Sequence, residues 1–392
     1  MSLDFLYGLV DLNFWGYVLV TFLMVQFTFM AVTLYLHRDA THRSLDLHPA
    51  LRHVFRFWLW MSSGMLTREW VAVHRKHHAR CETAEDPHSP MVLGLKKVLL
   101  EGAELYKEAA RTPGLLEKYG RGTPDDWMER NVYSKHRALG IVLMVIIDLV
   151  LFGVPGIIII GVQMLAVPLM AAGVINGIGH HTGYRNFECS DAARNIVPWG
   201  FIVAGEELHN NHHAFPSSAK FSVRPWEFDI GWLFIQVFSF FGLAKVRRVA
   251  PSLTRAQPRA DVDLETLRAV LVNRMHVLRD YARDVTVPVV RAQLRDLRGK
   301  AVRSARKLLV TEPLLLDSEA QRSLSELLAS NQALKTVYEF RERLNTLWSG
   351  KHVSNETLLQ HFKKWIADAE ASGVAVLQNY ARSMRGAQAI AS

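Results

Sequence analysis

Cysteine is scarce in this sequence: Cys81 and Cys189 are the only two among 392 residues. Two widely separated cysteines exclude the disulfide frameworks of small secreted domains, and they cannot form a Cys-x-x-Cys metal motif. The scarcity fits a reducing environment such as the cytoplasm.

Charge is absent from a long stretch near the N-terminus. No charged residue occurs from Leu12 to Leu36, and a helix of roughly 20 apolar residues is enough to cross a bilayer. The chain start lacks a basic region and a small-residue cleavage pattern, so residues 12–36 are interpreted as a retained anchor and not as a signal peptide. Basic residues follow this stretch and, by the positive-inside rule, place its far end in the cytoplasm. They are Arg38, Arg43, Arg52, Arg56 and Arg68.

A second long stretch, residues 138–178, contains one charged residue, Asp148. The glycines and proline at 153–156 are typical of a tight turn, so this stretch predicts a helical hairpin with spans at 138–153 and 156–178. Asp148 is close to that turn, and we expect its carboxylate to reach the lipid headgroups.

Three shorter apolar segments are expected to lie at the membrane interface, because each is too short to span. They are residues 51–66, 196–205 and 230–244. Residues 1–249 therefore predict an all-α, multi-pass membrane domain with its histidine-rich segments on the cytoplasmic side. The formal net charge of +9 could indicate nucleic acid, anionic lipid or an acidic protein as partner. Basic cytoplasmic segments of a membrane protein need only the lipid, and no nucleic-acid partner is expected.

The last third of the chain lacks long apolar runs, clustered histidines, a glycine-rich phosphate loop and a nucleophile elbow. Its apolar residues recur at helical spacing, with charged residues between them. The expected helices are 264–285, 290–310, 318–348 and 358–384, separated by Pro288, Pro313 and Gly350. Residues 250–392 therefore predict a soluble helical appendage with a structural or docking role. Residues 336–348 resemble the helical tail of some transposases, a likeness that carries no catalytic residue.

Histidine occurs in clusters at fixed spacings. His74, His77 and His78 form an H-x-x-H-H pattern, and His209, His212 and His213 repeat it. Positions i, i+3 and i+4 share one face of a helix, so each triplet predicts a metal-binding face. Two further pairs are His37 with His42, and Asn176 with His180. His37 and His42 would diverge on an unbroken helix, so they straddle a helix end or serve different metals.

The number of clustered imidazoles predicts two metal ions, because nine nitrogens exceed the four to six ligands of a single ion. The candidate ligands are His37, His42, His74, His77, His78, His180, His209, His212 and His213. A transporter would place such ligands near the bilayer midplane, and a structural zinc site would usually include cysteine. Two redox metals beside a lipid-sized apolar region instead indicate oxygen chemistry on an unactivated C–H bond.

Other polar residues near the clusters could have a role at the metal site or only a surface or packing role. Isolated His48, His53 and His181 are interpreted as surface or packing residues. For the neighbouring carboxylates, surface charge and orientation of a ligating imidazole both remain open. These are Asp39, Glu82, Asp86, Glu206 and Glu207. The helix that carries His74 is expected to continue to Pro87, which stops it.

Four motifs in order also resemble a known family. HRDATH at 37–42, HRKHH at 74–78 with EDPH at 85–88, NGIGHH at 176–181 and GEELHNNHHAFP at 205–216 are similar to the histidine boxes of membrane-bound fatty acid desaturases. The likeness is to the acyl-lipid and acyl-CoA delta-9 type, and it covers residues 12–248.

The resemblance implies a di-iron centre held by the nine histidines, with Asn176 holding an iron through water. It further implies an acyl tunnel near Trp70, O₂ as co-substrate, and electrons from a ferredoxin-like or cytochrome-type donor with its reductase. The expected reaction introduces a cis double bond, of delta-9 type, into an acyl chain of a phospholipid or an acyl thioester such as acyl-CoA. The expected location is the cytoplasmic (inner) membrane of a bacterium, with the metal site and C-terminus facing the cytoplasm. Gly173 stands where such proteins often have a bulky residue.

Two alternatives remain open at this point. A hydroxylase or ketolase of the same fold could use the same metals to add oxygen to the chain. A non-catalytic membrane metal-binding protein is a more distant alternative. Histidines midway through a span would be typical of it, and the predicted spans contain none there.

Overall fold

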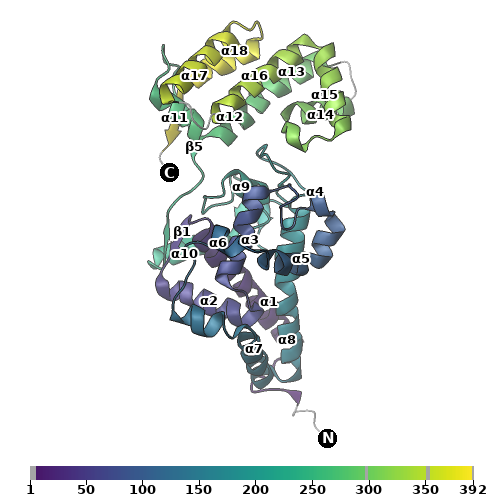
Figure 1. Ribbon diagram of the computed structural model, residues 1–392, viewed down its shortest axis with the longest axis vertical. Helices are drawn as coiled ribbons and strands as arrows, with labels where there is room; N and C mark the ends of the chain where they lie inside the picture. The colour runs from purple at the N-terminus through teal and green to yellow at the C-terminus, as the bar shows by residue number, and fades with distance from the viewer. Residues whose placement is uncertain (1–5, 296–298, 350–353, 391–392) are drawn as a thin grey trace. The chain divides into compact units, whose positions relative to one another are not determined.

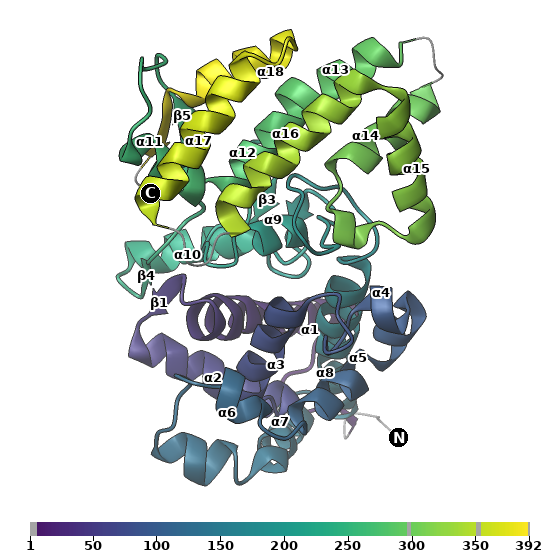
Figure 2. The ribbon, with the colours of Figure 1, turned by 45° about the horizontal axis from the view of Figure 1, so that its top comes forward.

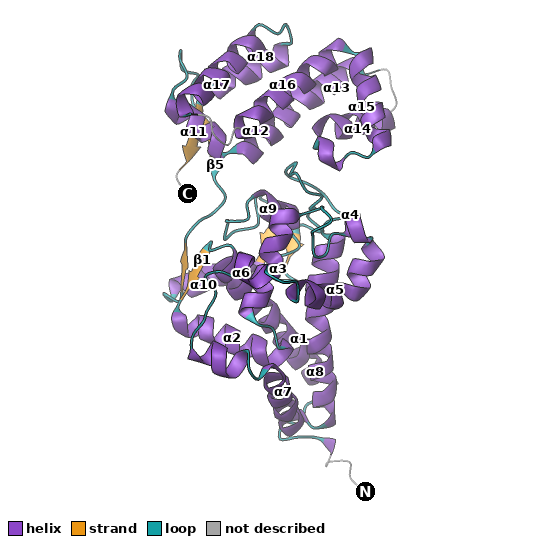
Figure 3. Cartoon of the chain, in the orientation of Figure 1, coloured by secondary structure: helices purple, strands orange, loops and turns teal. Residues whose placement is uncertain are grey.

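The structure is a computed structural model, and it describes residues 6–295, 299–349 and 354–390. Helices dominate the chain, and the strands are only two to four residues long (Figure 3). Two compact units are present: residues 1–185 with 191–250, and residues 186–190 with 251–392. The chain is thus mostly helical, as the sequence predicted.

The first unit is built from thirteen described helical segments (Figure 1). They are α1 (Phe14–Ala31), η2 (Val32–Thr41), α2 (Pro49–Ser63), α3 (Thr67–Arg80), α4 (Pro90–Leu93), α5 (Leu95–Ala110), α6 (Leu115–Tyr119), η3 (Glu129–Tyr133), α7 (Arg137–Phe152), α8 (Val154–Ala166), η4 (Val167–Ile178), α9 (His209–Ala214) and α10 (Ile230–Phe240). Two small sheets join distant segments. Strand β1 (Leu45–Leu47) pairs antiparallel with β4 (Ala244–Val246), and β2 (Trp199–Gly200) pairs parallel with β3 (Phe228–Asp229).

Within the described residues, two continuous helices are long and apolar enough to cross a membrane, Phe14–Thr41 and Val154–Ile178. Helix α7 has 16 residues and lies beside α8 in both views (Figures 1 and 2). The reversal between them is made by Gly153, whose φ of +65° favours glycine. Pro155 is the second residue of α8 and not part of the turn, and a proline fits there because the first turn of a helix needs no hydrogen bond from its nitrogen.

Asp148 differs from the expectation that it reaches the lipid headgroups. Its side chain is fully buried within the unit, and neither carboxylate oxygen has a hydrogen-bond partner among the described residues. The backbone of Asp148 is also covered, because a Cβ on Gly156 would lie 2.1 Å from the Asp148 carbonyl oxygen. The close packing of α7 on the start of α8 therefore encloses this residue.

A π-helix places the first pair of histidines on one face. Residues Val32–Thr41 form η2, and the His42 amide donates to the His37 carbonyl at 3.0 Å, across five residues. The wider turn of a π-helix brings residues five apart together, which an α-helix does not. His42 follows the last residue of η2, so the pair straddles a helix end, the first of the two predicted possibilities.

Glycines allow α5 and η4 to approach closely. A Cβ on Gly173 would lie 2.9 Å from the Leu99 carbonyl oxygen, and one on Gly102 would lie 3.0 Å from the Ala172 backbone. The gap at Gly173 is shorter than a Cβ contact tolerates and the gap at Gly102 is very tight, so a bulky residue at 173 does not fit this arrangement. The contact fixes the position of Asn176 on η4.

Helix α3 ends at Arg80, earlier than the predicted stop at Pro87. The Asp86 carboxylate accepts hydrogen bonds from the backbone amides of Glu82 at 2.9 Å and His88 at 3.1 Å. These bonds fold residues 81–88 into a compact turn, in which Glu82 has a φ of +60°. The acidic side chain, and not the proline, therefore ends the helix.

The three segments expected at the interface take different forms. Helix α2 buries Phe55 and Leu59, whereas α10 leaves Val237 and Phe240 exposed. Residues 196–205 contain the short strand β2 and turns.

The second unit is a helical bundle with a small sheet. Its described elements are β5 (Ser252–Arg255), α11 (Leu264–Val272), α12 (Arg274–Tyr281), η5 (Ala282–Thr286), α13 (Val287–Gln293), α14 (Gly299–Val310), η6 (Pro313–Leu315), α15 (Ser318–Ser330), α16 (Gln332–Ser349), α17 (Asn355–Glu370), α18 (Ala375–Met384) and β6 (Ala387–Ile390). Helix α16 runs between α17 on one side and α13 and α15 on the other (Figure 2). Strands β5 and β6 pair antiparallel.

The predicted helices of this unit are divided more finely than their apolar spacing indicated. The expected helix 318–348 breaks at Asn331, whose side chain caps the next helix by accepting from the Leu334 amide at 3.0 Å. The expected helix 264–285 breaks at Asn273. Pro288 does not separate helices, because it lies in the first turn of α13 directly after η5. The expected break at Gly350 lies outside the described residues.

Candidate metal centre

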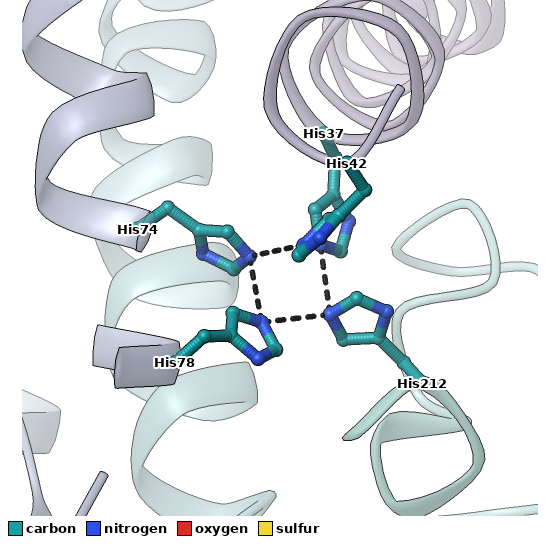
Figure 4. A group of neighbouring side chains, drawn as sticks. All are labelled: His37, His42, His74, His78 and His212. Atoms are coloured by element: carbon teal, nitrogen blue, oxygen red, sulfur yellow. Dashed lines mark hydrogen bonds between the residues drawn. The ribbon is translucent and has the colours of Figure 1, made fainter. Parts of the chain in front are cut away.

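Five imidazoles converge on one point in the first unit (Figure 4), and we call them the first metal group. They come from η2 and the residue after it, from α3 and from α9, and they are His37, His42, His74, His78 and His212. The His212 Nε2 atom lies 3.0 Å from the Nε2 atoms of both His37 and His78. The His74 Nε2 atom lies 3.1 Å from those of His42 and His78.

A second set of four imidazoles adjoins the first, and we call it the second metal group: His77, His180, His209 and His213. The ligand atoms of His77, His180 and His213 lie within 4.8 Å of one another. The His209 Nε2 atom is 2.9 Å from the His180 Nε2 atom. The rings of His78 and His213 stack with centroids 4.4 Å apart, so the two groups are neighbours.

This arrangement divides each predicted triplet between the two groups. His74 and His78 belong to the first group, while His77, between them on α3, belongs to the second. On α9, His212 belongs to the first group, and His209 and His213 contact the second. We expected each triplet to bind at a single metal site. Instead, α3 and α9 each contribute histidines to both metal groups.

Carboxylates determine which nitrogen of several rings faces inward. The Nδ1 atom of His37 is 2.7 Å from Glu206 Oε1, and that of His77 is 2.9 Å from Asp86 Oδ1. The Nδ1 atom of His180 contacts Glu82, and that of His213 contacts Asp191 Oδ2 at 3.1 Å. An ionised carboxylate accepts a hydrogen bond, so each Nδ1 carries the proton and each Nε2 presents a lone pair to the interior.

The inward lone pairs have a geometry that fits metal ions. Two nitrogens bound at right angles to one ion, each roughly 2.1 Å from it, lie roughly 3 Å apart, as these nitrogens do. Facing lone pairs repel when no cation lies between them. The Nε2 atom of His213 is moreover buried with no hydrogen-bond partner among the described residues. The donor set thus fits two ions, one for each group.

Burial and the carboxylates together determine the charge of the site. Burial, aided by the neighbouring rings, lowers the pKa of six imidazoles: His42, His74, His78, His209, His212 and His213. Burial by itself would raise the pKa of Asp86, but the interaction with His77, which includes a hydrogen bond, holds that pKa well below its usual range. Burial by itself would lower the pKa of His77, but the Asp86 carboxylate outweighs burial and raises that pKa. Neutral imidazoles and ionised carboxylates are the forms that bind and orient metals.

An apolar cavity of about 530 Å³ reaches the centre. His37, His74 and His209 form part of its lining, and aliphatic side chains such as Val73 and Ile175 form more of it. Its lining also includes charged residues, which are Glu69, Lys107, Arg111, Arg137 and Glu206. Arg137 pairs with Glu69. A cavity of this size, apolar with a few polar groups, is typical of a small-molecule site.

Asn176 and Trp70, the two remaining predicted site residues, both line this cavity. The Trp70 ring stacks on His74, with centroids 4.9 Å apart and planes inclined by 15°. Asn176 lies in the lining together with His209.

The carboxylates and isolated histidines near the clusters fall into two sets: some contact the metal groups and the others do not. Glu82, Asp86 and Glu206 orient imidazoles, as described above. Asp39 pairs with Arg52 at 2.6 Å, and Glu207 accepts the backbone amides of residues 202, 203 and 205. The isolated histidines stand apart from the metal groups: His48 caps α2, His53 lies near Tyr133, and His181 bonds Thr182.

Asp191 and Cys81 are two site residues that the sequence interpretation did not name. Asp191 lies in an irregular loop with no histidine nearby in sequence, so nothing in the pattern singled it out. Cys81 follows His77 by four residues and so continues the face of the triplet on α3, a signal that was present.

Two neighbouring histidine groups, each able to hold a metal, lie beside an apolar cavity, and this arrangement is typical of a metal-dependent enzyme with an apolar substrate. A family model described as fatty acid desaturase matches residues 12–229. The chain belongs to the fatty acid desaturase family, and it is an oxidoreductase of that family.

Curated relatives agree with this family. A probable lipid desaturase of Arabidopsis thaliana is 31% identical over 222 residues, which cover 55% of this chain and 59% of that protein. Delta-9 acyl-lipid desaturase 2 of Arabidopsis thaliana is 28% identical over 249 residues, covering 62% and 78%. The sn-1 stearoyl-lipid 9-desaturase of Synechocystis sp. is 29% identical over 247 residues, covering 62% and 75%. The chain thus spans less than two thirds of the first of these relatives and about three quarters of the other two.

A second family model, described as transposase, matches residues 267–389. This range lies within the second unit and includes residues 336–348, where the sequence resembles a transposase tail. The groups of histidine, cysteine and carboxylate side chains that could hold a metal all belong, in the described part of the chain, to the first unit.

Proposed function

We propose that this protein is an oxygen-dependent fatty acyl desaturase that introduces a cis double bond, of delta-9 type, with a di-iron centre. The observation that carries the proposal is the wall of the apolar cavity, which His37, His74 and His209 form together with Trp70. These histidines belong to both metal groups, so a chain in the cavity would pass beside both ions.

The protein's own residues would hold the ions and place the substrate. His37, His42, His74, His78 and His212 would hold one iron, and His77, His180, His209 and His213 the other, with Asn176 acting through a water molecule. Two bound irons would supply the oxidising power that removal of hydrogen from a methylene requires. Glu206, Asp86, Glu82 and Asp191 keep the ligating rings in place. Trp70, stacked on His74, would position the chain, and a displacement of about 1 Å can cost 100-fold in rate.

The charged residues of the cavity favour a substrate whose acyl chain ends in an anionic group. Lys107 on α5 and Arg111, the residue after that helix, are both exposed and both belong to the cavity lining. Phosphate groups occur in phospholipids and in coenzyme A, so either an acyl lipid or an acyl thioester would satisfy these cations. The three relatives described above are named as lipid desaturases, which favours the lipid.

The remaining assignments follow from the family and from the apolar helices. O₂ would be the co-substrate, and a ferredoxin-like or cytochrome-type donor with its reductase would supply electrons. Helices Phe14–Thr41 and Val154–Ile178, with α7, would anchor residues 1–249 in a bacterial cytoplasmic membrane, with the metal centre facing the cytoplasm. Residues 250–392 would form a separate module on the same side, with a structural or docking role.

Expression in a host that lacks acyl desaturases tests the proposal. Lipids are extracted from cells that make the intact chain, and phospholipid and thioester pools are analysed separately by mass spectrometry. The expected result is a loss of two hydrogens from acyl chains, with a cis double bond. A His212→Ala chain made to the same level should leave the lipids unchanged.

The two alternatives give different products. A hydroxylase or ketolase would add oxygen to the chain, which the same mass spectra detect, and this outcome would contradict desaturation. A non-catalytic metal-binding protein would consume no oxygen when purified and supplied with a reductant. Its occupancy by zinc, or by a single ion, would support that alternative.

A further inference from the structure

Cys81 continues the histidine face of α3 into the second metal group. It follows His77 by four residues and His78 by three, so the four side chains at 74, 77, 78 and 81 share one helix face. Its Sγ atom lies 3.9 Å from His77 Nε2 and 3.9 Å from His180 Nδ1. With His77, His180 and His213 it forms a set whose ligand atoms all lie within 4.8 Å of one another.

A second observation shows that a ligand belongs at this position. The Nε2 atom of His213, in the same set, is buried and has no hydrogen-bond partner among the described residues. Its other ring nitrogen is bound to Asp191, so Nε2 presents a lone pair to the space that Cys81 also borders. An unpaired buried lone pair is costly unless a cation meets it.

The second group also has fewer imidazoles than the first. The first group supplies five imidazoles, whereas the second supplies four. A thiolate is a strong ligand for iron, cobalt and zinc, and its reach of roughly 2.3 Å from the ion is compatible with a sulfur 3.9 Å from a ligating nitrogen at a wide angle.

We propose that Cys81 is a thiolate ligand of the ion held by the second metal group, which makes that site a mixed nitrogen and sulfur site. This rests on the two-metal centre of the proposed function. On binding, the S–H bond is replaced by a sulfur–metal bond and the proton leaves to solvent. A thiolate donates more electron density than an imidazole, so Cys81 would favour the higher oxidation state of the second iron over that of the first.

Cobalt substitution of the intact purified chain tests the proposal. Co²⁺ bound by thiolate has a sulfur-to-metal charge-transfer absorption in the near ultraviolet that Co²⁺ bound by imidazole lacks. The chain is loaded with two equivalents of Co²⁺, and the wild type is compared with Cys81→Ser and Cys189→Ser. Cys189 is the matched control, because it is the only other cysteine and belongs to none of the candidate metal groups.

We expect the absorption in the wild type and Cys189→Ser, its loss in Cys81→Ser, and a fall of about 10-fold or more in affinity for the second ion alone. Two bound ions with no such absorption, or an absorption that persists in Cys81→Ser, would overturn the role of Cys81 and leave the two-metal centre standing. A wild-type chain that binds fewer than two ions would overturn the centre itself, and the role of Cys81 with it.

A measurement on the unmodified chain avoids any folding defect of the variant. Cys81 is partly exposed, but burial and the nearby carboxylates raise the pKa of its thiol, so metal-free protein is incubated with iodoacetamide at alkaline pH to alkylate it, and peptide mass spectrometry locates the label. Two equivalents of Co²⁺ should slow the labelling of Cys81 at least 10-fold. An unchanged labelling rate of Cys81 in the metal-loaded chain would contradict ligation.

Discussion

Large exposed apolar side chains are concentrated in one of the two units. On α1 and α8 of the first unit, Trp15, Phe22, Ile158 and Leu165 are each more than half exposed. In the second unit the exposed ones, within its described part, are Leu264, Val272 and Leu314.

The interiors of the two units show the reverse pattern: that of the second unit is apolar, and that of the first is partly polar. The second unit has one continuous apolar core, in which Phe362, Trp365 and Leu344 are almost fully buried. The first unit buries imidazoles and carboxylates at its centre and divides its apolar core into several smaller clusters. An apolar outside with a polar inside suits a protein surrounded by lipid, and the reverse suits one surrounded by water. The comparison teaches that the first unit, unlike the second, has an exterior suited to lipid and an interior suited to metal ions.

The strongest test of this contrast is removal of one central imidazole. His212→Ala should lower desaturation at least 100-fold, because His212 Nε2 lies 3.0 Å from two other rings of the first metal group. Product formation and metal content of the purified chain measure this. His361→Ala, at an exposed histidine of α17, is the control and should change neither quantity. Equal losses in both variants would contradict the assignment.

The second unit should respond to loss of packing alone. Trp365 is buried, and its Nε1 atom donates to the Phe340 carbonyl at 2.9 Å. Trp365→Ala should destabilise this unit by about 3–5 kcal/mol, the usual cost of an aromatic deletion in a core. Hydrogen exchange of α16 and α17 in the intact chain should rise accordingly, while exchange of α3 stays unchanged. A loss of bound metal in this variant would show that the units are not independent.

An orienting carboxylate should matter less than a ligand. Asp86→Asn keeps the size of the side chain but removes the charge that holds His77. Changes of this kind typically cost 10- to 100-fold in metal affinity. Titration with Co²⁺ should show the loss for one ion of the two. Asp46→Asn, at a partly exposed carboxylate outside the metal groups, serves as control and should leave both affinities unchanged.

The cations of the cavity should have the smallest effect. Exposed charges contribute about 0.2–1 kcal/mol each, so Lys107→Ala with Arg111→Ala should raise KM a few-fold and leave kcat nearly unchanged. Kinetics with acyl phospholipid in mixed micelles measure both constants. Lys97→Ala is the matched control, because Lys97 is exposed on the same helix and does not line the cavity. A fall in kcat without a rise in KM would contradict a role in substrate binding.

Sequence reasoning found the histidines because their spacing is local and regular. It could not show how the histidines are divided between the two metal groups. Neighbours such as His77 and His78 belong to different groups because of the positions that α3 and α9 take in the fold. The π-helix that aligns His37 with His42 has no simple sequence signal. Asp191 reaches His213 from a loop, a contact that only the fold creates.

The sequence predicted that the second unit is helical, but it did not predict where its helices begin and end. Apolar spacing continues through Asn273 and Asn331, so periodicity alone merged helices that those residues separate. Asn331 ends one helix because its side chain caps the next. This hydrogen bond to the backbone competes with continuation of the helix, and apolar spacing gives no sign of it. Asp148 was misplaced for a related reason: its position beside a turn suggested exposure, whereas the packing of α7 on α8 buries it.

The metal content of the purified intact chain tests the two-metal centre most directly. Elemental analysis after loading with ferrous iron under anaerobic conditions should give two irons per chain, and one fewer or none in His212→Ala. A stoichiometry of one in the wild type, or exclusive retention of zinc, would contradict the centre proposed for this protein.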